Sequence, residues 1–214
     1  MKKYRGTLIL TSLIILLPML IGVLLWNQLP DQVATHFGMD GTPDGWSSRG
    51  FTVFGLPLFL LAVQFICAYV TQMDPKSRNI SDKMMTLVLW IIPVISLLVP
   101  VTIYGYALGF ETNYSAYGMA FVGVVFIIIG NYLPKCRQNY TVGIKLPWTL
   151  NDDENWNHTH RMAGFLWVVC GFAVVANAFL QWTWLFLVAV VVMVAAPTIY
   201  SYLFYKKHGE IKED

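Results

Sequence analysis

The chain has 214 residues, of which 57% are hydrophobic and only 12% are charged, and its formal net charge is +2. A soluble domain carries about 25% charged and roughly 45–50% apolar residues, so this composition excludes an ordinary water-soluble domain. The small net charge, with Lys and Arg in short separate clusters, also argues against direct binding to nucleic acid. The sequence therefore predicts an integral membrane protein whose main partner is the lipid bilayer.

Long intervals without Asp, Glu, Lys or Arg are the candidates to cross the bilayer. A helix needs about 20 apolar residues to cross about 30 Å of hydrocarbon. The last interval is twice too long, and we divide it at Gln181, Trp182 and Trp184, where a polar residue and interfacial aromatic residues interrupt the apolar run. The prediction is an all-α, polytopic membrane protein with six transmembrane helices, at residues 7–26, 52–72, 84–108, 115–133, about 162–180 and 183–204.

The distribution of basic residues predicts the orientation of these six helices. With the N-terminus inside, thirteen of the 14 Lys and Arg residues fall on the cytoplasmic side, and only Arg49 falls outside. Because cytoplasmic loops are enriched in Lys and Arg, we expect both termini in the cytoplasm. The first apolar run exceeds a signal-peptide core and lacks small residues for cleavage, so it is expected to be a retained anchor.

The predicted extracytoplasmic loop, residues 27–51, has turn-forming sequences. Asp-Gly and Pro-Asp-Gly favour tight turns, because Gly adopts positive φ at little cost and Pro presets φ, so we expect a compact, ordered loop. His36, Asp40 and Asp44 recur every four residues, which on a helix would place three metal-ligating side chains together. Pro43 and the neighbouring glycines disfavour that helix. Turn-stabilising hydrogen bonds are therefore favoured over a metal site.

The second specific segment is the predicted cytoplasmic loop, residues 134–161, with the start of the next helix. Thr149 or Asn151 is expected to cap this helix, and acidic residues follow in its first turn, where the helix dipole favours them. Trp156 and His160 should share one face and Arg161 a more polar one. One interpretation is a docking surface or an ion site. The other, favoured for any single residue, is a helix that packs on the preceding loop.

Two further hypotheses concern transport and metal chemistry. Prolines and two amides, Asn131 and Asn177, lie inside the spans and motivate a transporter or exporter of a small molecule or peptide, although intramembrane amides more often join helices. A metal-dependent membrane enzyme would use His36 or the pair His158 and His160, but residues two apart lie about 200° around a helix. The sequence has no Gly-x-Ser-x-Gly, Walker or H-E-x-x-H motif. We therefore predict no enzyme and assign no catalytic, cofactor-binding or metal-ligating residue.

Both specific segments resemble known families. The outer loop, LPDQVATHFGMDGTPDGW, resembles the bacterial membrane domain of unknown function DUF1648. The cytoplasmic segment, GNYLPKCRQNYTVGIKLPWTLNDDENWNHTHRMAGF, resembles the signature of the SdpI family of immunity proteins. On this resemblance residues 1–80 form a DUF1648-like region with two spans and the loop 27–51. Residues 81–214 form an SdpI-like region with four spans and the loop 134–161.

The resemblance implies a non-enzymatic protein of the bacterial plasma membrane that gives resistance to a secreted, membrane-active toxin peptide. It also implies signal transduction, in which the toxin-bound protein holds a cytosolic transcriptional autorepressor at the membrane. The implied toxin-facing surface consists of His36, Asp40, Asp44 and Trp46. The implied cytoplasmic partner surface consists of Asn139, Gly143, Trp148, Thr149, Trp156, His160 and Arg161.

Overall fold

The computed structural model of the chain describes residues 2–38, 41–110 and 113–212. In these residues six helices are long and apolar enough to cross a membrane, namely Arg5–Leu24, Phe51–Gln72, Asp82–Ala107, Tyr114–Lys135, Asp153–Leu180 and Trp184–His208. The prediction of a six-span helical membrane protein is confirmed.

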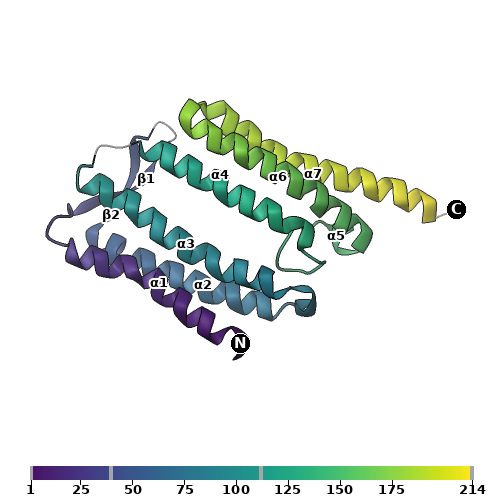
Figure 1. The fold of residues 1–214 in the computed structure, drawn as a ribbon, viewed down its shortest axis with the longest axis horizontal. Helices are drawn as coiled ribbons and strands as arrows, with labels where there is room; N and C mark the ends of the chain where they lie inside the picture. Colours follow the sequence, from purple (N-terminus) through teal and green to yellow (C-terminus); the bar gives the residue numbers. More distant parts are fainter. Residues whose placement is uncertain (1, 39–40, 111–112, 213–214) are drawn as a thin grey trace. The chain divides into compact units, whose positions relative to one another are not determined.

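The elements follow one another in a simple order (Figure 1). They are α1 (Arg5–Leu24), β1 (Gln32–Phe37), β2 (Pro43–Ser48), the π-helix η2 (Phe51–Gly55), α2 (Leu56–Gln72), α3 (Asp82–Ala107), α4 (Tyr114–Tyr132), α5 (Pro147–Leu150), α6 (Asp153–Leu180) and α7 (Thr183–Lys212). Three short 3-10 turns, Lys2–Tyr4, Ser77–Asn79 and Leu133–Lys135, complete the described elements. The second span combines η2 with α2, and the fourth combines α4 with its 3-10 turn.

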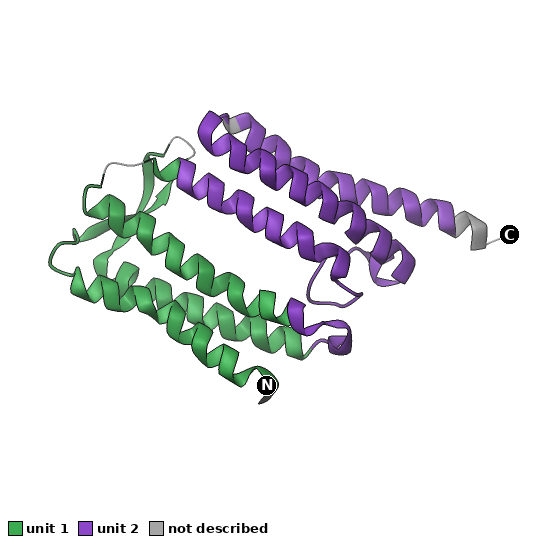
Figure 2. Ribbon diagram, viewed as in Figure 1, with its two compact units in different colours: residues 1–73, 85–115 green, residues 74–84, 116–214 purple. Residues whose placement is uncertain are grey.

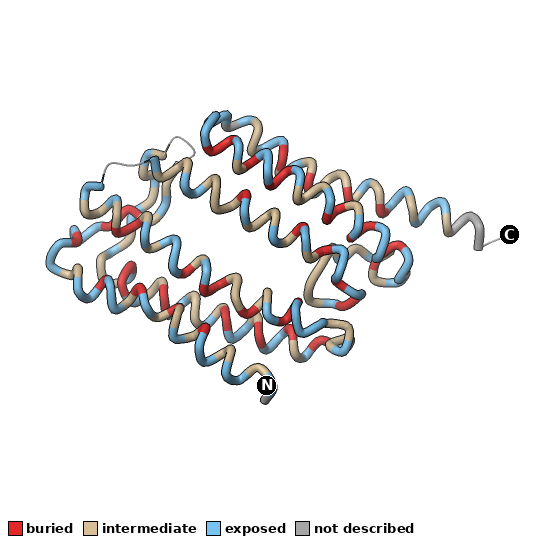
Figure 3. The backbone as a smooth tube through the Cα atoms, viewed as in Figure 1, coloured by how far each residue is buried: buried red, intermediate tan, exposed pale blue. Residues whose placement is uncertain are grey.

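The chain divides into two compact units (Figure 2). We call residues 1–73 and 85–115 the hairpin unit, and residues 74–84 and 116–214 the loop unit. Along the spans of each unit, buried positions alternate with exposed ones (Figure 3). Most of the exposed positions carry large apolar side chains such as Leu13, Phe59 and Phe179. In a bilayer these side chains face lipid, so their exposure costs nothing.

A buried amide joins the three helices of the hairpin unit. Gln64 of α2 donates from Nε2 to Thr11 Oγ1 of α1, at 3.1 Å, and to the carbonyl oxygen of Leu89 of α3, at 2.8 Å. Inside hydrocarbon a polar side chain needs a protein partner, so such amides hold helices together. Figure 1 shows α1, α2 and α3 side by side, with the β-hairpin at the end away from the N-terminus.

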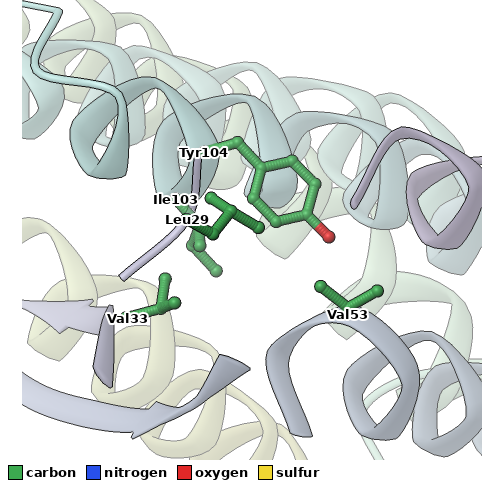
Figure 4. Close-up of a cluster of buried hydrophobic side chains, with 5 residues drawn as sticks. All are labelled: Leu29, Val33, Val53, Ile103 and Tyr104. Carbon is green, nitrogen blue, oxygen red and sulfur yellow. The ribbon is translucent and has the colours of Figure 1, made fainter. Parts of the chain in front are cut away.

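An apolar cluster lies where the hairpin meets these helices (Figure 4). Its buried members are Leu29, Val33, Val53, Ile103 and Tyr104. The Tyr104 hydroxyl donates to the carbonyl oxygen of Pro18, 3.3 Å away, so its polar atom is also satisfied. The cluster seats the inner face of the hairpin on the helices, while the side chains of His36, Asp44 and Trp46 are exposed.

Glycines bring α4 and α6 of the loop unit into backbone contact. A Cβ atom on Gly123 would lie 2.8 Å from the carbonyl oxygen of Gly171, and one on Gly130 would lie 2.9 Å from that of Gly164. The two contacting glycines of each helix lie seven residues apart, which keeps them on one face. Small residues allow this close approach, which is a main source of helix association in lipid.

A tight turn connects α6 to α7 at the predicted division of the long apolar interval. α6 ends at Leu180, Gln181 adopts a left-handed conformation with φ of 55°, and α7 begins at Thr183. Asn177 braces this turn, because its Oδ1 accepts from the Trp182 N–H and its Nδ2 donates to the Trp182 carbonyl, each at 3.0 Å. The intramembrane amide of Asn177 is thus used structurally.

Candidate functional site

The loop predicted to be extracytoplasmic contains a two-stranded antiparallel hairpin, β1 and β2. Register pairs Val33 with Ser47, Ala34 with Trp46, and His36 with Gly45, with irregularities on both sides of His36. In the turn, Gly41 has a φ of +80°, and the Gly38 N–H donates to the Thr42 carbonyl at 2.8 Å. This hydrogen bond closes a compact loop, as expected from the sequence. The second expected turn, at residues 43–45, is wrong, because these residues belong to strand β2, and neither strand was predicted.

Arg49 anchors the base of the hairpin. Its Nη1 donates to the carbonyl oxygen of Trp26 at 2.9 Å, its Nη2 bonds to the Asp31 carboxylate, and its guanidinium lies 5.2 Å from the Trp26 ring centre. These are charge-assisted and cation–π contacts, which are stronger than neutral ones. Arg49, the single Lys or Arg among residues 27–51, thus connects the end of the hairpin to the segment that follows α1.

Aromatic side chains hold the opposite end of the hairpin. The ring of Phe37 packs edge-on against Tyr106 of α3, with a centroid distance of 5.1 Å, and stacks on Tyr114 at 5.9 Å. Aromatic pairs at such distances add about 0.5–1.5 kcal/mol each beyond the area they bury. With both ends fixed, the outer face of the hairpin is held in place without a ligand.

The outer face presents a polar pair beside a large aromatic ring. His36 Nδ1 and Asp44 Oδ1 form a hydrogen bond, and both side chains are exposed. Trp46 is 55% exposed although its neighbour across the strands, Ala34, is buried. His36 and Asp44 meet because their strands pair, and not because they share one face of a helix. Asp40 lies outside the described residues, and within 2–38, 41–110 and 113–212 no three His, Cys, Asp or Glu side chains gather as a metal site would require.

In the loop unit, Asn139 organises the loop at residues 136–150, which we call the loop motif. Its Oδ1 accepts from the N–H groups of Thr141, at 2.9 Å, and Val142, at 2.6 Å. Its Nδ2 donates to the carbonyl oxygens of Arg137, at 2.8 Å, and Val142, at 3.0 Å. A buried amide with all its donors and acceptors used imposes one backbone path on its neighbours.

Trp156 and His160 of α6 hold the loop motif from the other side. Trp156 Nε1 donates to the Cys136 carbonyl at 2.7 Å, and His160 Nε2 accepts from the Ile144 N–H at 2.8 Å. His160 Nδ1 lies 2.8 Å from the carbonyl oxygen of Trp156. Because Nε2 accepts a hydrogen bond and Nδ1 faces a carbonyl oxygen, the imidazole is assigned as neutral with its proton on Nδ1. Both nitrogens of His160 are therefore occupied, which removes the proposed metal role with His158.

Gly143 lies flat against these two rings, which stack on each other with centroids 4.0 Å apart. Its φ is +122°, and a Cβ there would lie 2.5 Å from His160 Nε2 and 2.9 Å from the ring of Trp156. The position requires glycine for two independent reasons, backbone conformation and space.

The cap of α6 differs from the prediction. Asp152 is the cap, and its Oδ1 accepts from the N–H groups of Glu154, at 2.9 Å, and Asn155, at 3.2 Å. Thr149 is buried one turn earlier and accepts from the Leu146 N–H at 2.9 Å. Asn151 donates to the carbonyl of Pro147 at 2.8 Å. Both expected caps, Thr149 and Asn151, form hydrogen bonds within or next to the short helix α5. Asp152, the next side-chain acceptor along the chain, therefore caps α6.

Asp74 is a functional candidate that the sequence did not single out. Its carboxylate is buried, with Oδ2 accepting from the Tyr140 N–H at 2.9 Å and from Thr141 Oγ1 at 2.6 Å. Its Oδ1 accepts from the Lys76 N–H at 2.7 Å. Lys76 also bonds through Nζ to Gln138 Oε1. The connection between α2 and α3 is thereby tied to the loop motif. The one sequence signal was an acidic residue at the start of a basic segment.

Comparison with known proteins finds a similarity for each of the two segments. Residues 135–201 match the SdpI/YfhL protein family, and residues 13–61 match DUF1648, a domain of unknown function. The chain is 27% identical over 207 residues to the immunity protein SdpI of Bacillus subtilis (strain 168), which covers 93% of this chain and 96% of that protein. No solved structure matches. The chain is thus similar to the SdpI/YfhL family in residues 135–201, and to the immunity protein SdpI over most of its length.

The SdpI match coincides with one hydrogen-bonded body of the loop unit. It begins beside Cys136 and ends at Ser201, a buried residue of α7. Trp148 Nε1 bonds to Ser201 Oγ, and Asn155 Nδ2 donates to the Ser201 carbonyl at 3.0 Å. The DUF1648 match covers most of α1, the whole hairpin and the start of α2. The boundary at residue 80 between the two regions stays a prediction.

The structure buries most of the SdpI residues that were expected to form a partner surface. Asn139, Thr149, Trp156 and His160 are buried, and Gly143 is covered by two of them. Trp148 is half-buried against Tyr202, and Arg161 is exposed. The buried residues hold the loop motif from inside, in agreement with the interpretation that α6 packs on the preceding loop. Whether they serve a partner stays a prediction.

Cys136 should be a nearly inert thiol at neutral pH. Burial raises its pKa from about 9.0 to about 11, and its Sγ donates to the Val142 carbonyl at 3.2 Å. Because the thiolate is the nucleophile, alkylation at pH 8 should be about 100-fold slower than for an exposed thiol and should rise about tenfold per pH unit toward pH 11. Mass-spectrometric alkylation rates in a background where Cys67 and Cys170 are alanine would measure this. A rate equal to that of the denatured protein would contradict burial of the thiol.

Proposed function

We propose that this protein is a non-enzymatic membrane immunity protein that protects its cell from a secreted, membrane-active peptide toxin. The observation that carries the proposal is the similarity to the immunity protein SdpI of Bacillus subtilis, which extends over 93% of this chain and 96% of that protein. Similarity over more than nine-tenths of both chains includes the hairpin as well as the loop motif, so it is not limited to one shared segment.

The outer face of the hairpin is the proposed contact surface for the toxin. His36, Asp44 and Trp46 are exposed there, and Asp40 belongs to the same loop. A peptide at the membrane surface offers both polar and apolar groups, and Trp is among the residues that contribute most to binding. The fixed ends of the hairpin reduce the entropy lost on binding. We place this face outside the cell and both termini in the cytoplasm, supported by the basic residues of the other loops.

A cytosolic repressor is the second proposed partner, on the side of the loop motif. Its docking would use the exposed part of the segment, where Arg137, Lys145 and Arg161 present positive charge. The buried members of the predicted surface, Asn139 and His160 among them, would act by holding the loop in shape. A toxin could control this docking only by binding one conformation of the protein better than another.

The test is survival of a sensitive bacterium that expresses the protein and is challenged with a toxin peptide encoded near the protein's gene. We expect the double variant His36→Ala and Asp44→Ala, and separately Trp46→Ala, to need about tenfold less toxin for killing than the wild type, as loss of a binding hot spot would produce. Asp153→Ala is the matched control, since it removes an exposed carboxylate of α6. Membrane expression is measured for every variant.

The outcomes separate the proposals. If both hairpin variants protect as well as the wild type, the immunity proposal stands, but the hairpin is rejected as the contact surface for the toxin. Absence of protection by the wild type would reject immunity toward that peptide. Saturable flux in proteoliposomes would then favour the alternative, a small-molecule or peptide transporter or exporter.

A further inference from the structure

Three spans of the hairpin unit line an apolar hollow of about 150 Å³. It lies beside the cluster under the hairpin and shares Ile103 and Tyr104 with it. Its lining is almost entirely carbon. The lining comes from α1, η2, α2 and α3, and includes Thr52, Phe59, Leu60, Ile95, Ser96 and Val99.

The few polar atoms of the lining already have partners. Thr52 Oγ1 donates to the Ser48 carbonyl at 3.1 Å, and Ser96 Oγ donates to the Pro93 carbonyl at 2.8 Å. The Tyr104 hydroxyl donates to the Pro18 carbonyl at 3.3 Å. The lining therefore offers no free donor hydrogen to a ligand. An occupant that needs hydrogen bonds would lose them on entry, at a cost that an apolar occupant does not meet.

The depth of the hollow is set by the helix that follows β2. Its lining runs from Thr52 to Leu60 along η2 and α2, and at 1.5 Å per residue this reaches about 12 Å below the hairpin. One half of the hydrocarbon layer is about 15 Å thick. The hollow thus lies at the depth of the acyl chains, where a peptide backbone would need its own hydrogen-bond partners.

The hollow opens toward the lipid. Phe59 and Val99 both line it and are 61% and 37% exposed, and Leu58 beside them is also exposed. These side chains belong to membrane spans, so the medium at the mouth of the hollow is hydrocarbon. An apolar cavity of about this size stays dry and takes up a small apolar group such as benzene, which is comparable to a short run of methylene groups.

We propose that this hollow is a binding site for one acyl chain of a phospholipid from the leaflet on the side of the hairpin. The chain makes only apolar contacts, and at the concentration of lipid in a bilayer even weak affinity fills the site. Ile103 and Tyr104 contact both this chain and the cluster that seats Val33 of β1. The bound lipid therefore supports the hairpin from below. This inference does not depend on the immunity proposal.

The test uses the full chain in vesicles of phosphatidylethanolamine and phosphatidylglycerol that contain a trace of phospholipid with a photoactivatable diazirine in one acyl chain. After illumination, mass spectrometry locates the labelled residues. We expect labelling to concentrate on Leu60, Ile95 and Val99, above that of ordinary lipid-facing positions such as Leu13. Labelling spread evenly over the lipid-facing residues of α1, α2 and α3 would overturn the proposal.

Two filling variants make the test specific. Leu60→Trp, and independently Ser96→Leu, place extra volume in the hollow and should lower the concentrated labelling about tenfold, as expected when about two buried methylene groups are excluded. Leu58→Trp adds the same bulk outside the lining and should leave the labelling unchanged. Concentrated labelling that persists in both filling variants would overturn the assignment. A toxin peptide with a diazirine side chain that displaces the lipid label would also overturn it, in favour of a peptide occupant.

Discussion

Replacing Gly143 with Ala is expected to disrupt the loop motif more than any other single-methyl addition to it. The new Cβ would lie 2.5 Å from His160 Nε2 and 2.9 Å from the Trp156 ring, at a φ of +122°. Neither ring can yield easily, because Trp156 is bonded to the Cys136 carbonyl and His160 is bonded through both nitrogens. Backbone strain and overpacking together should lower the free energy of unfolding by about 2–5 kcal/mol.

Thermal unfolding of the purified protein in detergent would measure this loss, and limited proteolysis within residues 136–150 would locate it. Gly118→Ala is the matched control, because a Cβ there meets nothing within 4 Å and Gly118 lies on α4. It should be neutral or slightly stabilising, since Ala is the better helix former. Equal stability of the Gly143 and Gly118 variants would show that the loop motif can move away from the two rings.

Asp74→Ala is expected to release the loop motif from the connection between α2 and α3. The substitution leaves the N–H groups of Lys76 and Tyr140 and the hydroxyl of Thr141 without their carboxylate acceptor. Unsatisfied buried groups cost about 1–3 kcal/mol each, and because water can reach part of the site we expect a total loss of about 2–4 kcal/mol. The stability of Asp74→Asn should lie between that of the wild type and that of Asp74→Ala. The amide keeps one acceptor oxygen, but its NH2 group faces an N–H that has lost its acceptor.

Hydrogen exchange at the Tyr140 amide is the direct measurement for Asp74, because that N–H donates to the carboxylate. Exchange should accelerate in Asp74→Ala. The control Asp153→Ala removes an exposed acid from the first turn of α6 and should cost less than about 1 kcal/mol through the helix dipole, with no change at Tyr140. Unchanged exchange in Asp74→Ala would mean that the carboxylate does not hold the loop.

The six spans followed from the sequence because the bilayer imposes a simple requirement on composition. A chain that crosses hydrocarbon must satisfy its backbone within each helix and carry few charges, so the spans can be read without knowing any contact. The division at Gln181 followed in the same way from an interruption of the apolar run. Composition does not predict the left-handed conformation of Gln181 or the hydrogen bonds from Asn177 that hold the turn.

The hairpin shows where sequence reasoning stopped. The turn chemistry near Gly41 predicted a compact loop, but both strands have only six residues, and β2 contains Pro43, Asp44 and Gly45, residue types that are depleted in strands. Which side chains meet across the strands depends on register, and a shift of one residue would exchange the two faces. The contact between His36 and Asp44, and the anchoring by Arg49, therefore became visible only in the folded chain.

The sequence by itself determined what depends on neighbours along the chain: six apolar spans, the basic loops, the turn at Gly41, and a common helix face for Trp156 and His160. The tertiary structure decided which of these faces is buried. It also brought together residues far apart in the chain, such as Asp74 with Tyr140 and Trp148 with Ser201. Such contacts have no local signature, because they exist only after loops have closed and the groups have exchanged water for one another.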